Sequence, residues 1–91
     1  MYELTQEDID KGVPGASNAC PIAVCLHRNL QENIEVTLFS TNIGGKHYYN
    51  DGHTVNFVAT YDSYRKVKPG KVEIYEVGWN RYVGYKEREV L

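Results

Sequence analysis

The sequence predicts a small α+β domain, and three observations support this fold class. Apolar residues recur at three- and four-residue steps over 20–31, as expected for an amphipathic helix. Apolar and polar residues alternate over 34–39, which indicates a half-buried strand. The chain has 91 residues, 42% of them hydrophobic, which suffices for one core. We therefore expect a single compact domain over 1–91, with a small, mostly antiparallel sheet against two main helices and a charged tail from about residue 86.

A short helix is predicted near the N-terminus, after a possible strand over 2–4. Thr5 is a suitable N-cap residue, and the acidic Glu7 and Asp8 that follow it favour the positive end of the helix dipole. The pair Lys11–Gly12 then supplies a basic last turn and a stop. One or two helical turns fit between these signals.

A loop of small residues from Gly12 to Ala19 precedes the longer helix. Ser17 and Asn18 are residue types that cap helices. Pro21 fits the first helical position, where its missing N–H costs nothing. We expect this helix to span 20–31.

The middle of the chain predicts a hairpin, and the C-terminal third predicts further strands. Gly44–Gly45 is a candidate two-residue turn that leads to a short returning strand over 47–49. Pro69–Gly70 predicts another turn. Strands are then expected around Val72 and Ile74, and over 81–85.

The segment 54–65 is ambiguous. Its β-branched and aromatic residues favour a strand by propensity. Its apolar residues follow helical steps, however, and Thr54 could cap a helix. We expect a helix here.

Composition excludes some classes of function. The net charge is −2, from 10 basic and 12 acidic residues, which disfavours a duplex DNA binder. The first residues are acidic rather than hydrophobic, and no apolar run is long enough to span a bilayer, so we expect a cytoplasmic protein that binds no membrane. Eight tyrosines suit interfaces and stacking sites. Because so small a domain gains from burying more surface, we also expect a homo-oligomer.

The two cysteines are expected to be structural. Cys20 and Cys25 would lie about 140° apart around a helix, so a disulfide between them is disfavoured. Their spacing is not that of a zinc site. His27 would stand two turns from Cys20, about 10 Å along the axis, too far for a direct nucleophile–base contact.

The start of the longer helix is one candidate ligand site. A helix N-terminus offers free N–H groups to an anion, and Asn18 stands beside it. The favoured alternative is a loop that caps its own helix, since neither the P-loop nor the dinucleotide pattern is present. Arg28 could hold a phosphate through its fork of donors, although solvation is the commoner role of an exposed arginine.

The hairpin over 40–51 is a second candidate. It combines hydroxyl and amide side chains, one cation and two adjacent tyrosines, a combination that can hold a base and a phosphate. A hairpin with one tyrosine in the core explains the pattern equally well, because neighbouring strand residues point to opposite faces. The candidate residues are Ser40, Thr41, Asn42, Lys46, Tyr48, Tyr49 and Asn50.

A basic cluster follows the segment 54–65. It could meet a phosphate or an acidic partner, although a solvated turn is favoured. No convincing nucleophile, base or metal cage is recognisable, so we expect no enzyme activity, no metal and no cofactor. The cluster consists of Arg65, Lys66, Lys68 and Lys71.

Several residues resemble a family of small phage-encoded proteins. The pattern is Thr5-x2-Asp8-Ile9-x2-Gly12-x-Pro14, then Cys20-Pro21-Ile22-Ala23, and later Tyr61-Asp62. The resemblance covers roughly 5–77, and it extends to the phage sponge proteins that bind cyclic nucleotide signals and so blunt CBASS-type defence. After the shared motif this chain continues with Val24-Cys25-Leu26, where the family usually has Ala-Leu.

The resemblance implies a non-catalytic protein that sequesters a cyclic nucleotide such as 3′3′-cGAMP in the host cytoplasm. The ligand-binding residues expected for this function are Asn18, Arg28, Ser40, Asn42, Lys46, Tyr48 and Tyr49. The alternative is a small protein–protein interaction module that inhibits or adapts a host protein through its tyrosine-rich surface. An enzyme that degrades the signal is a third possibility.

Overall fold

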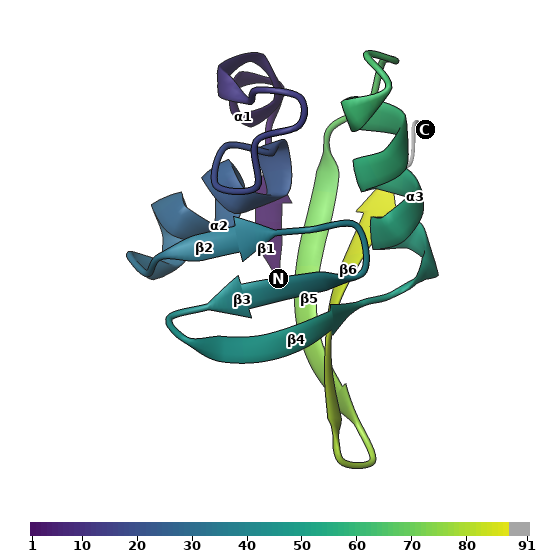
Figure 1. The fold of residues 1–91 in the computed structure, drawn as a ribbon. Coiled ribbons are helices and arrows are strands. Elements are labelled where there is room, and N and C mark those ends of the chain that lie inside the picture. Colours follow the sequence, from purple (N-terminus) through teal and green to yellow (C-terminus); the bar gives the residue numbers. More distant parts are fainter. Residues whose placement is uncertain (88–91) are drawn as a thin grey trace.

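A computed structural model describes residues 1–87 of the chain and confirms the α+β class. In this part of the chain, six strands form one mixed sheet in the order β1-β5-β6-β4-β3-β2. Three helices accompany the sheet (Figure 1). The charged tail predicted from about residue 86 lies largely outside the described residues.

The N-terminal elements agree with the sequence. Strand β1 (Tyr2–Leu4) leads into helix α1 (Gln6–Lys11). The Thr5 side chain accepts a hydrogen bond from the Asp8 backbone N–H, and the Asp8 side chain accepts one from the Thr5 N–H. This capping box closes the start of a helix too short to be stable by propensity alone.

Helix α2 (Pro21–Leu30) begins with proline at its first position, as predicted. Its N-cap is Cys20, which makes no side-chain capping hydrogen bond, so the expectation that Ser17 and Asn18 fit as caps is wrong. The loop folds back instead: the Ser17 carbonyl accepts a hydrogen bond from the Val36 N–H, which ties the loop to the edge of the sheet.

The central hairpin is formed by β3 (Ser40–Ile43) and β4 (Lys46–Asn50). Gly44 and Gly45 have φ of 56° and 87°, the left-handed values that a tight two-residue turn requires. Strand β2 (Ile34–Val36) is shorter than predicted. It ends in a turn closed by a hydrogen bond from the Thr37 N–H to the Ser40 carbonyl, so the alternation up to Phe39 does not mark a strand.

The ambiguous segment is a helix, as predicted. Helix α3 spans Gly52–Asp62 and is capped by Asp51, whose carboxylate accepts from both the N–H and the hydroxyl of Thr54. Thr54 is therefore the capped residue and not the cap. The helix ends three residues earlier than predicted, before Tyr64 takes a left-handed φ of 61°.

The two longest strands are β5 (Gly70–Val77) and β6 (Asn80–Glu87). They form an antiparallel hairpin around Gly78, whose φ is 62°. Strand β4 pairs with β6 in parallel at two positions, whereas the other neighbouring strands pair antiparallel. The sheet is therefore mixed but mostly antiparallel, as predicted. Far from the core this hairpin extends as a two-stranded ribbon beyond the rest of the sheet (Figure 1).

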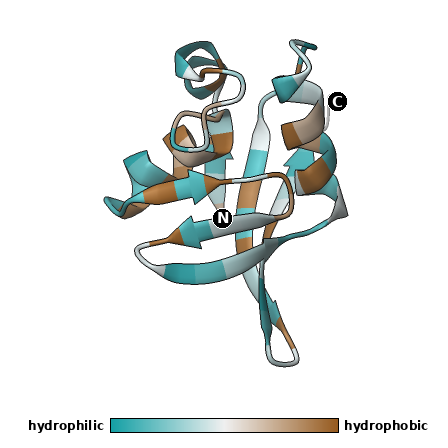
Figure 2. Cartoon of the chain, viewed as in Figure 1, coloured by the Kyte–Doolittle hydropathy of each residue, from teal (hydrophilic) through white to brown (hydrophobic). Residues whose placement is uncertain are grey.

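The core lies between one face of the sheet and the helices. Leu4, Val72 and Val83 are fully buried on that face, against Ile22 and Leu26 of α2. Figure 2 shows hydrophobic segments in α2, β2 and α3 and a mostly hydrophilic β4.

We call the opposite face of the sheet the open face. The side chains on this face of the described strands are exposed or half-buried, and Gly84 is the buried residue there. Cross-strand partners share a face, so the register assigns the side chains of Ser40, Asn42, Tyr49, Glu73, Tyr75 and Tyr82 to it. No helix of the described chain has the length and apolarity needed to cross a membrane.

Candidate functional site

The predicted ligand-binding residues do not converge on one site. Ser40, Asn42 and Tyr49 lie on the open face of β3 and β4. Lys46 and Tyr48 alternate with them and lie on the opposite face. The remaining two, Asn18 and Arg28, line a separate cavity of about 440 Å³ beside α1 and α2.

Arg28 is occupied by an internal contact. Its guanidinium donates to both Asp8 carboxylate oxygens at 3.2 and 2.8 Å and to the Glu3 carbonyl at 2.9 Å. Burial alone would raise the pKa of Asp8, but the hydrogen bond and the charge of Arg28, with the hydrogen bonds of Thr5, lower it. Arg28 thus stabilises a buried carboxylate, and its Nε and Nη2 groups are already engaged by Asp8 and the Glu3 carbonyl.

Two of the hairpin residues also serve local structure. The Ser40 hydroxyl lies 2.9 Å from that of Thr37, within the turn after β2. The Asn42 side chain accepts from the Gly45 N–H at 2.9 Å and so supports the hairpin turn. On the other face, the Arg81 guanidinium lies 5.9 Å from the centre of the Tyr48 ring.

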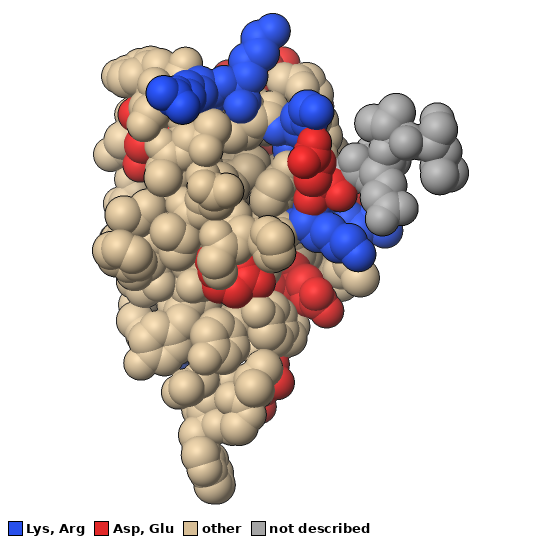
Figure 3. All heavy atoms as spheres, turned by 90° about the vertical axis from the view of Figure 1, so that its right-hand side faces the viewer, with Lys and Arg blue, Asp and Glu red and all other residues tan. Residues whose placement is uncertain are grey.

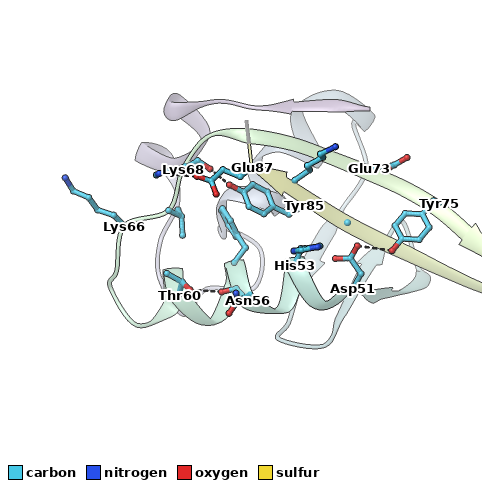
Figure 4. Close-up of a pocket in the computed structure, with 14 residues that line it drawn as sticks. Asp51, His53, Asn56, Thr60, Lys66, Lys68, Glu73, Tyr75, Tyr85 and Glu87 are labelled. Atoms are coloured by element: carbon cyan, nitrogen blue, oxygen red, sulfur yellow. Dashed lines mark hydrogen bonds and ion pairs between the residues drawn. The ribbon is translucent and has the colours of Figure 1, made fainter. Parts of the chain in front are cut away.

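A cleft of about 720 Å³ lies between α3 and the strands β5 and β6. One wall is formed by α3, with Asn56 and Thr60 in its second half. The other wall is formed by the strands, with Tyr75 and Tyr85 (Figure 4). The volume falls in the range that small-molecule sites occupy.

The cleft exists because α3 lies along the part of β6 that β4 leaves unpaired. The Asp51 N–H and the Thr54 hydroxyl both donate to the Val83 carbonyl, at 3.0 and 2.8 Å. Gly84 lines the cleft without a side chain. A Cβ there would lie 2.6 Å from the Asp51 carboxylate and 3.0 Å from the Tyr75 ring, so glycine permits the close approach.

Charged side chains stand at the end of the cleft near the α3–β5 connection. Lys68 forms an ion pair with Glu87 at 3.1 Å, and both are well exposed. Lys66 is at the rim and points outward in Figure 4. Lys66 and Lys68 come from the basic cluster noted in the sequence, and Lys86 on β6 joins them. The lining also holds three carboxylates, Asp51, Glu73 and Glu87.

The opposite end of the cleft is built around Tyr75. Its hydroxyl donates to the second Asp51 carboxylate oxygen at 2.8 Å (Figure 4). Burial, together with this hydrogen bond and the Asp51 charge, raises the pKa of Tyr75 to about 12. The phenol is therefore a fixed hydrogen-bond donor over the ordinary pH range.

Tyr75 also begins a row of aromatic rings across the open face. Its ring stacks on Tyr82 at 5.4 Å between centres, and Tyr82 lies 6.0 Å from Tyr49. His47 meets Tyr49 edge-on at 4.8 Å. We name these four residues the aromatic row.

The structure is consistent with the structural role predicted for the cysteines. Cys20 and Cys25 are both buried and free, and burial raises the pKa of each thiol to about 11. Among residues 1–87, no group of three or more His, Cys, Asp or Glu side chains could hold a metal ion.

Sequence reasoning missed the residues that shape the cleft. The sequence indicates Asp51 only as the last residue of the hairpin 40–51, and it does not single out Tyr75. The N-cap position of Asp51 could have been found from its spacing to Thr54, but its contact with Tyr75 joins residues 24 apart. No family model matches the chain, and comparison with curated proteins and with solved structures finds no significant match.

Proposed function

We propose that the protein binds a small anionic nucleotide in the cleft between α3 and the β5–β6 strands, and that it sequesters this ligand without turnover. The observation that supports the proposal is the cleft itself. It offers about 720 Å³, with lysines at one end and the Tyr75–Asp51 pair at the other. Such a polarity suits a molecule with a phosphate at one end and a base at the other.

The chemistry of each end matches one part of a nucleotide. Lys68 and Lys86 can approach a phosphate, which would replace Glu87 as the partner of Lys68. The exposed amide of Asn56 supplies a donor and an acceptor for a base edge. The Tyr85 ring, whose hydroxyl donates to the Lys68 carbonyl at 2.6 Å, lies at the phosphate end, and the Tyr75 ring lines the other end, where the base would lie.

The resemblance of the sequence to phage sponge proteins selects the ligand class to test first. A cyclic dinucleotide such as 3′3′-cGAMP would be held in the host cytoplasm, away from its defence receptor. Because the ribose–phosphate ring of such a ligand is two-fold symmetric, two copies of the chain could share it across a two-fold axis. Light scattering with and without ligand measures this assembly.

Calorimetry against a panel of linear and cyclic nucleotides tests the proposal. We expect at least one member to bind with a Kd below about 10 μM, roughly −7 kcal/mol. Mass spectrometry of the ligand released by heating should recover it intact. If no nucleotide binds below that limit the proposal is wrong, and if the ligand is degraded the protein is an enzyme.

Three matched lysine variants locate the site. Lys68→Ala and Lys86→Ala should each weaken binding at least tenfold with little change in Tm, because both side chains are exposed. Lys46→Ala, on β4 and outside the cleft, should leave affinity unchanged. The reverse pattern would return the site to the β3–β4 hairpin that the sequence first suggested.

A further inference from the structure

The β5–β6 hairpin leaves a length of strand edge uncovered. Strand β1 pairs with β5 only from Gly70 to Val72. Along 73–77, the described structure places no strand against the outer edge of β5, while its inner edge pairs with β6 throughout. Alternate backbone N–H and C=O groups of these five residues therefore point away from the sheet.

This edge belongs to a ribbon that projects from the domain. Strand β4 contacts β6 through pairs at Tyr82 and Val83, so the end of the hairpin has no neighbouring strand on either side among the described residues (Figure 1). Val77 is 60% exposed and Trp79 is fully exposed. Two-stranded ribbons are marginally stable alone in water, so an additional strand would support this one.

The side chains along the edge carry negative charge. Glu73 and Glu76 are exposed, and the edge segment 73–77 contains no basic residue. Figure 3 shows Lys and Arg gathered over the upper part of one side of the molecule, with acidic side chains nearer the hairpin. Opposite charges on paired strands stabilise a sheet, and like charges destabilise it.

We propose that an extended, basic segment of a partner protein adds to this edge as a further strand. Main-chain hydrogen bonds to 73–77 supply the affinity, and alternating side chains supply the specificity. An Arg or Lys side chain would face Glu73 on the open face, whereas Glu76 on the other face already pairs with Arg81 at 3.6 Å. The Tyr75 ring lies between these positions along the strand and offers a face for a guanidinium.

Charge selects this partner over a second copy of the chain. A second β5 edge would add another Glu73 carboxylate and another Glu76, which Arg81 already pairs, and the segment 73–77 itself has no basic residue to offer the first copy. Strand addition uses the backbone edge of β5, which the cleft does not use, whereas the side chains of Glu73 and Tyr75 belong to both surfaces. The nucleotide panel and the peptide assay measure the two kinds of binding separately, so each proposal can fail on its own.

Fluorescence anisotropy tests the proposal with a fluorescein-labelled ten-residue peptide of alternating Arg and Val, whose arginines all lie on one face of a strand and can therefore meet Glu73 on the open face. We expect it to bind the full chain at least tenfold more tightly than a Glu–Val peptide of the same length. N-methylation of the peptide backbone at every second residue keeps the charge and removes donors, so it should weaken binding at least tenfold. Equal binding of the methylated peptide would overturn the proposal, because charge alone would then explain the affinity.

Paired charge reversals then locate the interaction. Glu73→Lys should weaken binding of the Arg–Val peptide at least fivefold. The control, Glu35→Lys, makes the same change in charge at an exposed open-face position on β2, at the other end of the strand order from β5, and should leave peptide binding unchanged. Circular dichroism and Tm confirm that both variants fold. Equal loss in both variants, or no binding by the wild-type chain, would contradict the proposal. A concentration-dependent dimer of the wild-type chain that competes with the peptide would instead identify a second copy as the occupant.

Discussion

The helical half of the molecule, formed by α1 and α2 and the strand face they cover, differs from the β5–β6 hairpin in how far its side chains are buried and paired. In the helical half, Asp8 is buried and paired with Arg28, and Leu26 has no exposed surface. In the hairpin, Trp79 and Val77 lie in water and the outer strand edge is open. The first region carries stability, and the second offers contacts that the described chain does not use.

The same contrast applies to polar groups. Asn50 is buried at the junction of β3 and β4, where its side chain accepts from the Thr41 hydroxyl at 2.6 Å and donates to the Thr37 carbonyl at 2.8 Å. No buried side-chain N or O atom among the described residues lacks a partner. Buried polar groups that already have hydrogen-bond partners stabilise the fold but leave few donors or acceptors for a ligand.

The largest effect should come from the core. Leu26→Ala removes a fully buried side chain and should lower the free energy of unfolding by about 3 kcal/mol. Leu38→Ala, at a side chain 39% exposed, should cost less than about 1 kcal/mol. Urea unfolding followed by circular dichroism measures both. Equal losses would mean that the helical half does not carry the stability.

The Asp8–Arg28 pair should make stability depend on pH. The pKa of Asp8 is lowered on folding, so its contribution is complete above the ordinary value of 3.8 and is lost as pH falls through the folded pKa. Unfolding free energies at pH 6 and pH 3 should therefore differ less in Asp8→Asn than in the wild type.

The partner residue provides a second measurement. Arg28→Ala should cost about 1–2 kcal/mol near neutral pH, because it leaves a buried carboxylate without its main donor. Lys11→Ala removes an exposed pair with Glu7 and should cost less than about 0.5 kcal/mol. A loss in Lys11→Ala as large as that in Arg28→Ala would show that burial does not distinguish the two pairs.

Tyr75 lies where the two regions meet, and its removal should have an intermediate effect. Tyr75→Phe deletes the hydrogen bond to Asp51 and should cost about 1 kcal/mol. Since the pKa of Tyr75 is raised to about 12, this contribution is complete below pH 10 and is lost as pH rises toward 12. Tyr64→Phe, at a side chain 83% exposed, is the control and should change stability little.

The sequence predicted the elements whose signals are local. Helical spacing with Pro21 gave α2, the Gly44–Gly45 pair gave the central hairpin turn, and the periodicity of 54–65 outweighed its β propensity. Each of these signals acts over a few residues. The parallel pairing of β4 with β6 joins residues more than thirty apart, and no local pattern records it.

The candidate site was less predictable for the same reason. Tyr48 and Tyr49 were correctly expected on opposite faces, because strand alternation is local. Arg28 was expected to be available to a phosphate, but Asp8, which holds it, lies twenty residues away. The cleft joins Asp51, Tyr75 and Lys86 from three elements, so only the folded chain reveals it.

The smallest effect on stability should come from Trp79→Ala. This side chain is fully exposed at the hairpin turn, so its removal should change the free energy of unfolding by less than about 0.5 kcal/mol. Because Trp79 is the one tryptophan of the chain, wild-type fluorescence reports on this turn directly. Its emission should be that of a water-exposed indole and should barely shift on unfolding in urea. A large blue-shifted emission in the native state, or a loss of stability near that of Leu26→Ala, would show that the hairpin end packs against something and that the two regions are not distinct.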